Sequence, residues 1–412
     1  MAPSPKPRSR ASGRYRESSP CVTWAAARRR KPERRQAMKK RAKTVARKPA
    51  RATGGLEALR QKIDSVDERI QALIAERAGL AQQVAVVKGG TGSAADFYRP
   101  EREVAVLRGV IARNKGPLTD EEMVRLFREI MSACLAQEEP MKVGYLGPEG
   151  TFSQSAVYKH FGHSVRALPL GMIDEVFGEV ESGAADFGVV PIENSTEGTV
   201  NHTLDMFLTS PLKVCGEVEM RIRQHLLGKM TSLEQVIRVS AHPQSLAQCR
   251  GWLREFLPQA ELHPASSNAE GARRARDEDG TAAIAGDAAA EVYGLAKIVA
   301  DIEDRPDNTT RFLVIGRKLL EPSGSDKTSL LLSTKDTDDA GALQKLLAPL
   351  AEHQINMSRI ESRPSRRRKW HYVFFVDIDG HADDSKVAPA LAKLRKRAQL
   401  FRVLGSYPKA VL

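Results

Sequence analysis

The sequence has no long apolar run and only four cysteines. No stretch of about 18 apolar residues, which a membrane-spanning helix requires, occurs among its 412 residues. The cysteines, at positions 21, 134, 215 and 249, are too widely spaced for a zinc site or a close-set disulfide framework. We therefore expect a protein of the reducing cytoplasm, without a membrane span or a metal site.

Acidic residues are nearly absent from the first 52 positions, although they are common elsewhere. This segment holds 18 of the 64 Lys and Arg residues but only two of the 51 Asp and Glu residues, so the net charge of +13 belongs to it. Few apolar residues accompany these charges, which predicts a disordered basic extension over residues 1–54. A nucleic-acid or membrane-surface arm, an Arg-rich targeting peptide and translation that starts at Met38 are open alternatives. We expect neither a nucleic-acid nor a membrane partner.

Apolar residues recur in steps of three and four from Leu56 to about Lys88, which predicts one long helix. At 1.5 Å per residue this helix is roughly 50 Å long, longer than a small domain is wide. Because its apolar stripe needs a partner along the whole length, we expect a homodimer and leave open whether dimers pair into tetramers. Two further helices are predicted over residues 99–114 and 118–139. Residues 55–140 thus form an all-helical module.

Short apolar runs alternate with helical stretches over residues 141–318, which is typical of an α/β region with mainly parallel strands. Polar residues follow several of these runs, and the ends of parallel strands are where such folds bind substrates. After a linker that contains Gly and Ser, residues 327–407 show the order β-α-β-β-α-β of a ferredoxin-like α+β module. We therefore expect three folded units behind the basic extension.

Three basic side chains lie near the apolar stripe of the long predicted helix rather than on its polar face. Helical projection places Arg60, Arg77 and Lys88 there. A half-buried cation needs an anionic partner. From the pattern alone, salt bridges between subunits and an anionic ligand explain these residues equally well.

The stretches "LEALRQKIDSVDERIQALIAERAGLAQQVAVVK", "FYRPERE" and "LFREIMSACLAQE" resemble the helical class of chorismate mutases, which implies an intertwined dimer. The rearrangement of chorismate to prephenate is intramolecular, so such an enzyme holds a folded conformer and stabilises charge on the ether oxygen. The resemblance implies that cations bind the carboxylates and the ether oxygen and that an acid takes the hydroxyl. The implied catalytic residues are Arg60 from the other subunit, Arg77, Lys88, Arg102 and, as the acid, Glu103.

Three further positions depart from one version of this family pattern. Glu138 stands where a Gln can face Lys88 across the ether oxygen, which implies a catalytic role, but a Glu donates a hydrogen bond only when it is protonated. The sequence leaves open whether Glu138 is protonated at the working pH. Arg99 and Cys134 stand at implied substrate-binding positions where an acid and a Ser can occur.

Four motifs in the α/β region, "GYLGPEGTFS", "PIENSTEGTV", "HPQSLAQC" and "NTTRF", resemble those of prephenate dehydratase in content and order. The resemblance implies two α/β lobes, like those of type II periplasmic binding proteins, with the active site in the cleft between them. The implied reaction removes carbon dioxide and the ring hydroxyl of prephenate and gives phenylpyruvate. Without the resemblance, the polar residues of these motifs can equally be capping loops or entries to strands.

The stretch Asn-Thr-Thr-Arg-Phe offers no general base, yet a departing hydroxide needs a proton or a strong hydrogen bond. A hydroxyl group can donate one without adding charge beside the departing carboxylate. The resemblance implies Thr310 as the catalytic donor, Arg311 as a residue that orients a carboxylate or the loop, and Phe312 as a cover against water. Substrate-binding residues are implied on the opposing lobe at Glu193, Asn194, Ser195, Thr196 and Gln248.

The stretches "GALQKLLAPLAEHQ" and "INMSRIESRP" resemble the amino-acid-binding ACT regulatory domain. An ordinary strand and helix core is the alternative explanation of the same pattern. The resemblance implies that phenylalanine binds at an interface between subunits. The implied effector-binding residues are Gly341, Ala342, Leu343, Glu361, Ser362 and Arg363.

Together, these resemblances predict a bifunctional enzyme of phenylalanine biosynthesis, a chorismate mutase and prephenate dehydratase that phenylalanine inhibits. The expected ligands are chorismate, prephenate and phenylalanine, and no cofactor is expected. The expected architecture is a basic extension (1–54), a helical mutase domain (55–140), a bilobed α/β dehydratase domain (141–318) and an ACT domain (327–407). A phenylalanine-sensing protein with decayed catalytic modules is the rival hypothesis.

Overall fold

The computed structural model describes residues 53–87, 98–137, 140–335, 340–365 and 371–411. The predicted catalytic residues Lys88 and Glu138 lie outside the described residues, as does the basic extension up to residue 52. The chain divides into two units, residues 1–63 and 64–412, and the boundary falls within the first helix. No helix in the described part of the chain is long and apolar enough to cross a bilayer.

Helix α1 (Thr53–Val87) runs without a break, as the apolar periodicity predicts. Its large apolar side chains are exposed, namely Leu56, Leu59, Ile63, Val66, Ile70, Leu73, Ile74, Leu80, Val84, Val86 and Val87. Helices α3 (Pro100–Arg113) and α4 (Asp120–Leu135) pack against each other. A reciprocal capping box between Thr119 and Glu122 begins α4, because the first backbone N–H groups of a helix need acceptors. These helices confirm the predicted all-helical segment.

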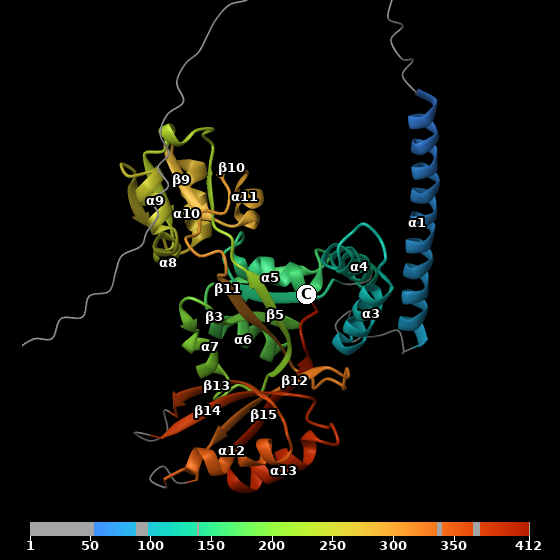
Figure 1. Cartoon of the computed structure of the whole chain (residues 1–412), viewed down its shortest axis with the longest axis vertical. Coiled ribbons are helices and arrows are strands. Elements are labelled where there is room, and N and C mark those ends of the chain that lie inside the picture. Colours follow the sequence, from blue (N-terminus) through green and yellow to red (C-terminus); the bar gives the residue numbers. More distant parts are fainter. Residues whose placement is uncertain (1–52, 88–97, 138–139, 336–339, 366–370, 412) are drawn as a thin grey trace, which may run out of the picture. The chain divides into compact units, whose positions relative to one another are not determined.

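The first lobe of the α/β region is built on a six-stranded mixed sheet (Figure 1). Its strands are β1 (Lys142–Leu146), β2 (Arg166–Leu170), β3 (Phe187–Asn194), β4 (Gly198–Thr199), β5 (Lys213–Arg221) and β11 (Thr309–Gly316). Neighbours follow the order β2-β1-β3-β11-β5, and β4 pairs with β3. The helices of this lobe are α5 (Phe152–Phe161), α6 (Ile173–Ser182) and α7 (Asn201–Met206).

The second lobe contains a five-stranded sheet with the order β10-β6-β9-β7-β8. Its strands are β6 (His225–Gly228), β7 (Arg238–Ala241), β8 (Glu261–Pro264), β9 (Thr281–Ala285) and β10 (Ala296–Val299). Its helices are η1 (Leu233–Gln235), α8 (Pro243–Gln248), α9 (Arg250–Phe256), α10 (Asn268–Asp277) and α11 (Asp287–Tyr293). The chain enters this lobe after Arg221 and returns to the first sheet at Thr309 (Figure 1). The two lobes are therefore joined by two crossings of the chain.

The expectation of mainly parallel strands in this region is wrong. Strands β1, β2 and β3 are parallel, and so are β7, β8 and β9. However, β6 and β11, the strands at which the chain enters a lobe from the other one, pair antiparallel with their neighbours. Parallel neighbours need a crossover within the same lobe, usually a helix, whereas a strand that arrives from the other lobe can run in the opposite direction.

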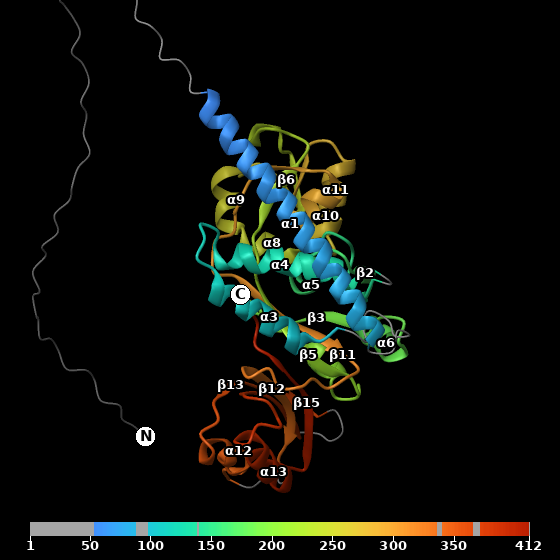
Figure 2. The ribbon, with the colours of Figure 1, turned by 90° about the vertical axis from the view of Figure 1, so that its right-hand side faces the viewer.

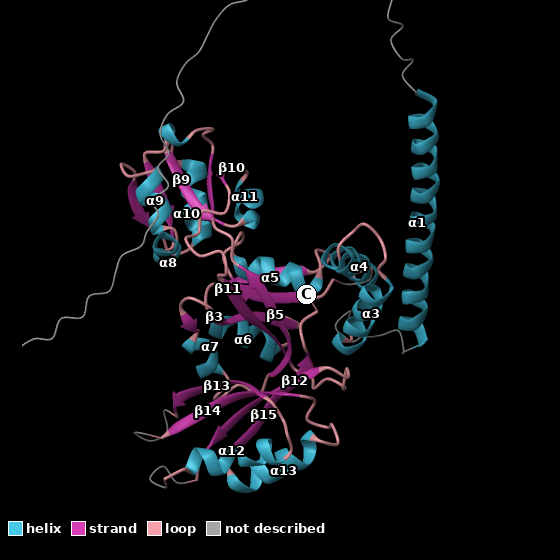
Figure 3. Cartoon of the chain, in the orientation of Figure 1, coloured by secondary structure: helices cyan, strands magenta, loops and turns pink. Residues whose placement is uncertain are grey.

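The last domain has the predicted β-α-β-β-α-β order. Its elements are β12 (Asp326–Ser333), α12 (Ala342–Glu352), β13 (Met357–Pro364), β14 (Tyr372–Asp379), α13 (Val387–Arg397) and β15 (Leu400–Pro408). The antiparallel sheet has the order β13-β14-β12-β15. Both helices cover one face of this sheet, and the other face is turned toward the first lobe (Figures 2 and 3).

A continuous apolar core joins this last sheet to the first lobe. Leu331, Phe375 and Tyr407 pack in the same buried cluster as Leu313 and Ile315 of β11. Strand β15 also runs against β5 at short range. At Gly405 a Cβ atom would overlap backbone atoms of Val214, so only glycine permits this approach. The final domain is therefore packed on the lobe that contains β11.

Candidate functional site

A cavity of about 350 Å³ lies beside α1, α3 and α4 in the unit formed by residues 64–412. Three of its lining side chains are cationic, namely Arg77, Arg99 and Arg102. Glu103 and the buried Cys134 line it as well. Five residues predicted for the mutase therefore lie around one cavity, and guanidinium groups suit the carboxylates of a small dianion.

The other predicted mutase residues do not contribute to this cavity in the described part of the chain. Arg60 belongs to the other unit, where its exposed guanidinium lies 3.8 Å from Glu57. Lys88 and Glu138 fall outside the described residues. Their roles stay predictions.

Glu103 is held by an ion pair at the edge of this cavity. The Nε of Arg128 lies 3.4 Å from its Oε1, and both side chains are 14% exposed. Burial raises the pKa of Glu103 above its ordinary value, while the charge of Arg128 and hydrogen bonds from Tyr98 and Arg128 act against this rise. The ionised form could accept a hydrogen bond from a substrate hydroxyl, which is the role predicted for it.

A second group of polar side chains lies between the two α/β lobes, and Asn194 is at its centre. The Oδ1 of Asn194 accepts hydrogen bonds from the backbone N–H of Thr196 (3.0 Å), the Oγ1 of Thr196 (2.6 Å) and the backbone N–H of Glu197 (3.1 Å). These three donors fix the orientation of the amide. Its Nδ2 then donates to Asn308 Oδ1 at 2.9 Å and to Thr310 Oγ1 at 2.8 Å.

The bond from Asn194 determines what the hydroxyl of Thr310 can do. Since an amide N–H can only donate, Thr310 Oγ1 is the acceptor in this bond. Its own proton therefore points elsewhere, and no acceptor for it occurs within the described ranges. Thr310 is 9% exposed. The site thus offers one oriented, neutral O–H donor in a largely buried position.

Gln248 connects this group to the second lobe. It alone confirms the prediction of residues on the lobe opposite Thr310; for Glu193 to Thr196 that prediction is wrong, because β3 pairs with β11 in the same sheet. Its Nε2 donates to Thr196 Oγ1 at 3.1 Å, and its Oε1 accepts from Asn308 Nδ2 at 3.0 Å and from Gln224 Nε2 at 3.3 Å. The network continues through Ser245, which accepts from Gln224 (3.0 Å) and from Asn268 (2.8 Å). We name the six side chains around the interlobe contact the amide cluster: Asn194, Thr196, Gln224, Gln248, Asn308 and Thr310.

Sequence reasoning missed several members of this network. Asn308 and Ser245 stand inside the quoted motifs and could have been chosen there. Gln224 and Asn268 lie outside the four motifs, and no signal in a single sequence marks them. They are brought in by the turn that leaves β5 and by the start of α10.

The remaining predicted dehydratase residues have other surroundings. Ser195 Oγ accepts from the backbone N–H of Thr309 at 2.9 Å. Glu193 forms an ion pair with Arg359 of the last domain at 2.9 Å. Phe312 is 1% exposed and packs in the lobe core. Arg311 points away from the amide cluster and contacts Glu217, Asp377 and Tyr407.

The predicted effector residues lie on two elements of the last domain. Gly341, with φ of +78°, precedes α12, and Ala342 and Leu343 form its first turn. Glu361, Ser362 and Arg363 lie on β13. Glu361 accepts a 2.9 Å hydrogen bond from Thr199, and Arg363 pairs with Asp205 at 3.0 Å, so β13 contacts the first lobe at both places.

Comparisons with known proteins match three segments of this chain. Family models match for chorismate mutase type II over residues 59–139, for prephenate dehydratase over residues 143–319 and for the ACT domain over residues 336–396. The bifunctional chorismate mutase/prephenate dehydratase of Stutzerimonas stutzeri is 56% identical over 361 residues, which cover 87% of this chain and 98% of that protein. This chain belongs to the bifunctional chorismate mutase/prephenate dehydratase family.

Solved structures of prephenate dehydratases resemble about two thirds of this bifunctional enzyme. A prephenate dehydratase from Arthrobacter aurescens, solved in complex with L-Phe, is 38% identical with a TM-score of 0.61 and covers 66% of this chain and 93% of its own. The enzyme from Staphylococcus aureus is 31% identical with a TM-score of 0.58 and covers 65% of this chain and 100% of its own. The predicted chorismate mutase and prephenate dehydratase activities and fold class are thereby confirmed.

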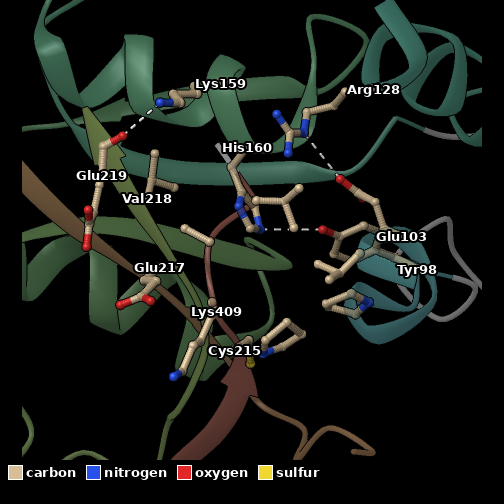
Figure 4. Close-up of a pocket in the computed structure, with 16 residues that line it drawn as sticks. Tyr98, Glu103, Arg128, Lys159, His160, Cys215, Glu217, Val218, Glu219 and Lys409 are labelled. Carbon is tan, nitrogen blue, oxygen red and sulfur yellow. Dashed lines mark hydrogen bonds and ion pairs between the residues drawn. The ribbon is translucent and has the colours of Figure 1, made fainter. Parts of the chain in front are cut away.

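A small pocket lies where the mutase helices meet the dehydratase lobe and the end of the chain (Figure 4). Tyr98 Oη lies 3.5 Å from His160 Nε2, and Lys159 Nζ donates to the carbonyl oxygen of Glu219 at 2.8 Å. Burial lowers the pKa of His160 to about 3, and the charge of Arg128 contributes in the same direction. His160 is therefore a neutral hydrogen-bonding group at this junction.

The low pKa of His160 predicts a loss of stability in acid. The imidazole is neutral in the folded protein down to about pH 3, whereas in the unfolded chain it takes up a proton below its ordinary value of 6.5. The unfolded state thus binds one proton more between these values, so stability falls as the pH decreases through this window. The contribution to the slope is up to about 1.4 kcal/mol per pH unit.

The variant His160→Gln should reduce this slope, as chemical unfolding measured between pH 6.5 and 4 would reveal. His263 is exposed and pairs with Glu261 at 3.2 Å, so His263→Gln serves as the control that removes a histidine from the surface. An identical slope in His160→Gln and the wild type would show that His160 does not carry this proton linkage.

Proposed function

We propose that the amide cluster is the dehydratase site and that Thr310 is its proton donor. In the reaction, the bond to the departing carboxylate breaks and its electron pair enters the ring, while the ring C–O bond breaks and oxygen leaves with a proton as water. Aromatisation supplies most of the driving force, so the protein has to orient prephenate and help the hydroxyl leave. The observation that carries this proposal is the hydrogen bond in which Asn194 donates to Thr310 Oγ1.

The neutrality of the cluster suits this chemistry. Amide and hydroxyl side chains can hydrogen-bond both oxygens of a carboxylate without pairing with it as a full countercharge. A nearby Arg or Lys would stabilise the carboxylate of the ground state, which disappears in the reaction, and would raise the barrier. Glu193 and Arg311, two of the charged residues of these motifs, have their ion-pair partners elsewhere.

The variant Thr310→Ala should lower dehydratase turnover by about 100-fold or more, the usual scale for the loss of a proton donor. Phenylpyruvate formation from prephenate measures the dehydratase, and chorismate consumption by the same sample shows that the mutase is intact. Thr309→Ala is the matched control, since the Thr309 hydroxyl contacts only the carbonyl of Asp307, at 3.3 Å, among the described residues. Equal losses in the two variants would count against Thr310 as the donor.

We also infer that the mutase works as a homodimer, with tetramers left open. The apolar side chains of α1 are exposed over its whole length, and a surface of that kind is normally covered by another copy or partner. The cavity beside α3 and α4 supplies the cations Arg77, Arg99 and Arg102. Arg60 of a second copy would complete the grip on the two carboxylates of chorismate, and Lys88 and Glu138 keep their predicted places at the ether oxygen.

A mixing experiment tests the shared mutase site. If Arg60 and Arg77 act in one site from different chains, Arg60→Ala and Arg77→Ala are each inactive alone, and refolding them together restores about a quarter of the wild-type activity, since half of the dimers then contain one intact site. Arg77 and Arg102 line the cavity from one chain, so mixing Arg77→Ala with Arg102→Ala should restore nothing. Failure of the first pair to recover would exclude a site shared in this way.

We propose phenylalanine as the ligand of the ACT domain and feedback inhibitor of the dehydratase. The prephenate dehydratase of Arthrobacter aurescens was solved in complex with L-Phe and is 38% identical. In this chain the residues assigned to the ligand are Gly341, Ala342, Leu343, Glu361, Ser362 and Arg363.

We place the enzyme in the cytoplasm, where the buried thiols of Cys134, Cys215 and Cys249 stay reduced.

The variant Gly341→Val should abolish inhibition by phenylalanine while dehydratase turnover without phenylalanine stays comparable. Gly341 has φ of +78°, which a β-branched residue does not adopt without strain, so the turn before α12 would change shape. Gly324→Val, at φ of +83° in the linker, controls for strain of the same kind elsewhere. Inhibition curves over a range of phenylalanine concentrations decide the matter, and retained inhibition in Gly341→Val would refute this site.

A further inference from the structure

Thr310 and Arg311 are adjacent in sequence but point to opposite faces of β11, since side chains alternate along a strand. Phe312, on the same face as Thr310, is buried in the core of the first lobe. Leu313, on the same face as Arg311, packs in the cluster that contains Tyr407 of the ACT domain. Arg311 therefore faces the regulatory domain and not the amide cluster.

The guanidinium of Arg311 closes a ring of hydrogen bonds with three ACT residues. Its Nη1 donates to Asp377 Oδ2 at 2.8 Å, and its Nη2 donates to Tyr407 Oη at 3.1 Å. Tyr407 and the Oγ of Ser329 lie 2.9 Å apart, and Ser329 donates to Asp377 Oδ1 at 2.6 Å. Because Arg311 can only donate and an ionised Asp377 can only accept, the direction of every bond in the ring is determined.

The charges in and beside this ring are buried, and the two cations balance the two anions. The side chain of Arg311 is 13% exposed, and those of Glu217 and Asp377 are 2% and 9% exposed. Lys327 adds a second cation, 2.8 Å from Glu217. Burial acts to lower the pKa of Arg311, but the interactions with Tyr407, Asp377 and Glu217 outweigh burial and hold that pKa above its ordinary value. Separating a buried ion from its partner is strongly destabilising. Arg311 therefore has little freedom to move while Asp377 is in place.

The backbone beside Thr310 is the part of the sheet that such an anchor can control. Thr310 lies opposite Asn194 in the ladder between β11 and β3, and the register of this ladder shifts between Arg311 and Phe312. The extra residue of this bulge is Ile192 of β3, whereas β11 pairs with β5 without a shift from Thr309 to Val314. A bulged strand bends and changes the direction of its neighbouring side chains, so the ladder with β3 alone does not fix Asn194 against Thr310. The position of Thr310 against Asn194 therefore depends on how each of the two strands is held from outside their ladder, and Arg311 is the residue of β11 beside Thr310 that has such contacts.

Strand β3, which pairs with β11, is also linked to the ACT domain by an ion pair. Glu193 directly precedes Asn194, and its carboxylate lies 2.9 Å from Arg359 of β13. Arg359 also donates to Thr199 at 3.3 Å, and Thr199 donates to Glu361 at 2.9 Å. Both residues of the pair that orients the proposed donor thus have a sequence neighbour that is ion-paired to the regulatory domain.

We propose that Asp377 of the ACT domain is a positioning residue of the dehydratase, which acts through Arg311 on the position of Thr310 against Asn194. This inference rests on the proposed role of Thr310. It couples the ACT domain directly to the proposed active site, because a movement of β14 is transmitted through Arg311 to Thr310, the adjacent residue of the same strand. The second alternative of the sequence prediction for Arg311, that it orients the loop, is the one that this arrangement favours.

The variant Asp377→Asn in the full-length enzyme tests the proposal, because it removes the charge and keeps the shape. We expect dehydratase kcat to fall by about tenfold, within the range found for residues in contact, with KM and mutase turnover unchanged. The concentration of phenylalanine that gives half inhibition should change as well, which a mere loss of folded enzyme would not cause. Asp379→Asn is the matched control on the same strand, since Asp379 pairs with Lys409 at 2.7 Å and should leave these quantities unaltered.

A double-mutant cycle separates this proposal from the role of Thr310. If Asp377 acts through Thr310, adding Asp377→Asn to Thr310→Ala should lower kcat by less than about twofold further. Multiplicative losses would show that Asp377 acts by another route and would overturn the proposal. If Thr310→Ala alone has no effect, the proposed donor is wrong, whereas a normal Asp377→Asn enzyme beside an impaired Thr310→Ala enzyme refutes only the positioning role.

Tyr407→Phe covers the case in which Asp377→Asn does not fold. It removes one hydrogen bond to Arg311 and keeps the ring that fills the core between the two domains. A smaller loss of dehydratase kcat in the same direction, again with a shift in half inhibition by phenylalanine, supports the proposal. Unchanged kcat and unchanged inhibition in this variant would contradict it.

Discussion

The antiparallel pairing of β11 with β3 is the interaction on which the proposed dehydratase site depends. The second lobe is inserted between β5 and β11, and its chain returns to the middle of the first sheet rather than to an edge. The register of this pairing sets Thr310 opposite Asn194. Because the chain leaves the first lobe after β5 and returns at β11, the two crossings between the lobes lie beside this pairing. The hydrogen bonds of Gln248 with Thr196 and with Asn308 form at these crossings.

Strand β11 separates two kinds of chemistry on its two faces. The face of Thr310 meets amides and hydroxyls, whose hydrogen bonds are directional and carry no net charge. The face of Arg311 meets carboxylates in a buried setting, where ion pairs are held tightly because neither charge can return to water. In the proposed mechanism, a single strand therefore presents a neutral donor to a substrate that loses its carboxylate and, one residue later, an ion-paired arginine to the regulatory domain. The ACT sheet is packed directly on this lobe, which makes the anchor possible.

Much of the architecture could be predicted from the sequence because it rests on local periodicity. Apolar residues at every third or fourth position predicted α1, and the order of the predicted strands and helices indicated the fold of the ACT domain. The residue types of the motifs around Asn194 and Thr310 predicted the dehydratase site, and that assignment stays a prediction. By contrast, mainly parallel strands were predicted for the α/β region and are wrong, since strand direction depends on where the chain returns after a long excursion. Gln224 and Asn268 could not be found, because no local pattern marks them.

By itself, the sequence determined the three folded segments and the two catalytic activities that its motifs indicated, and it predicted a hydroxyl rather than a general base at Thr310. These follow from periodicity and residue type, which are properties of neighbours in the chain. Only the tertiary structure decided which groups surround Thr310 and which surround Arg311. Alternation along a strand separates the two side chains, but the partner on each face comes from residues more than sixty positions away. Such partners are selected by packing and by the pairing of buried charges, which no local pattern encodes.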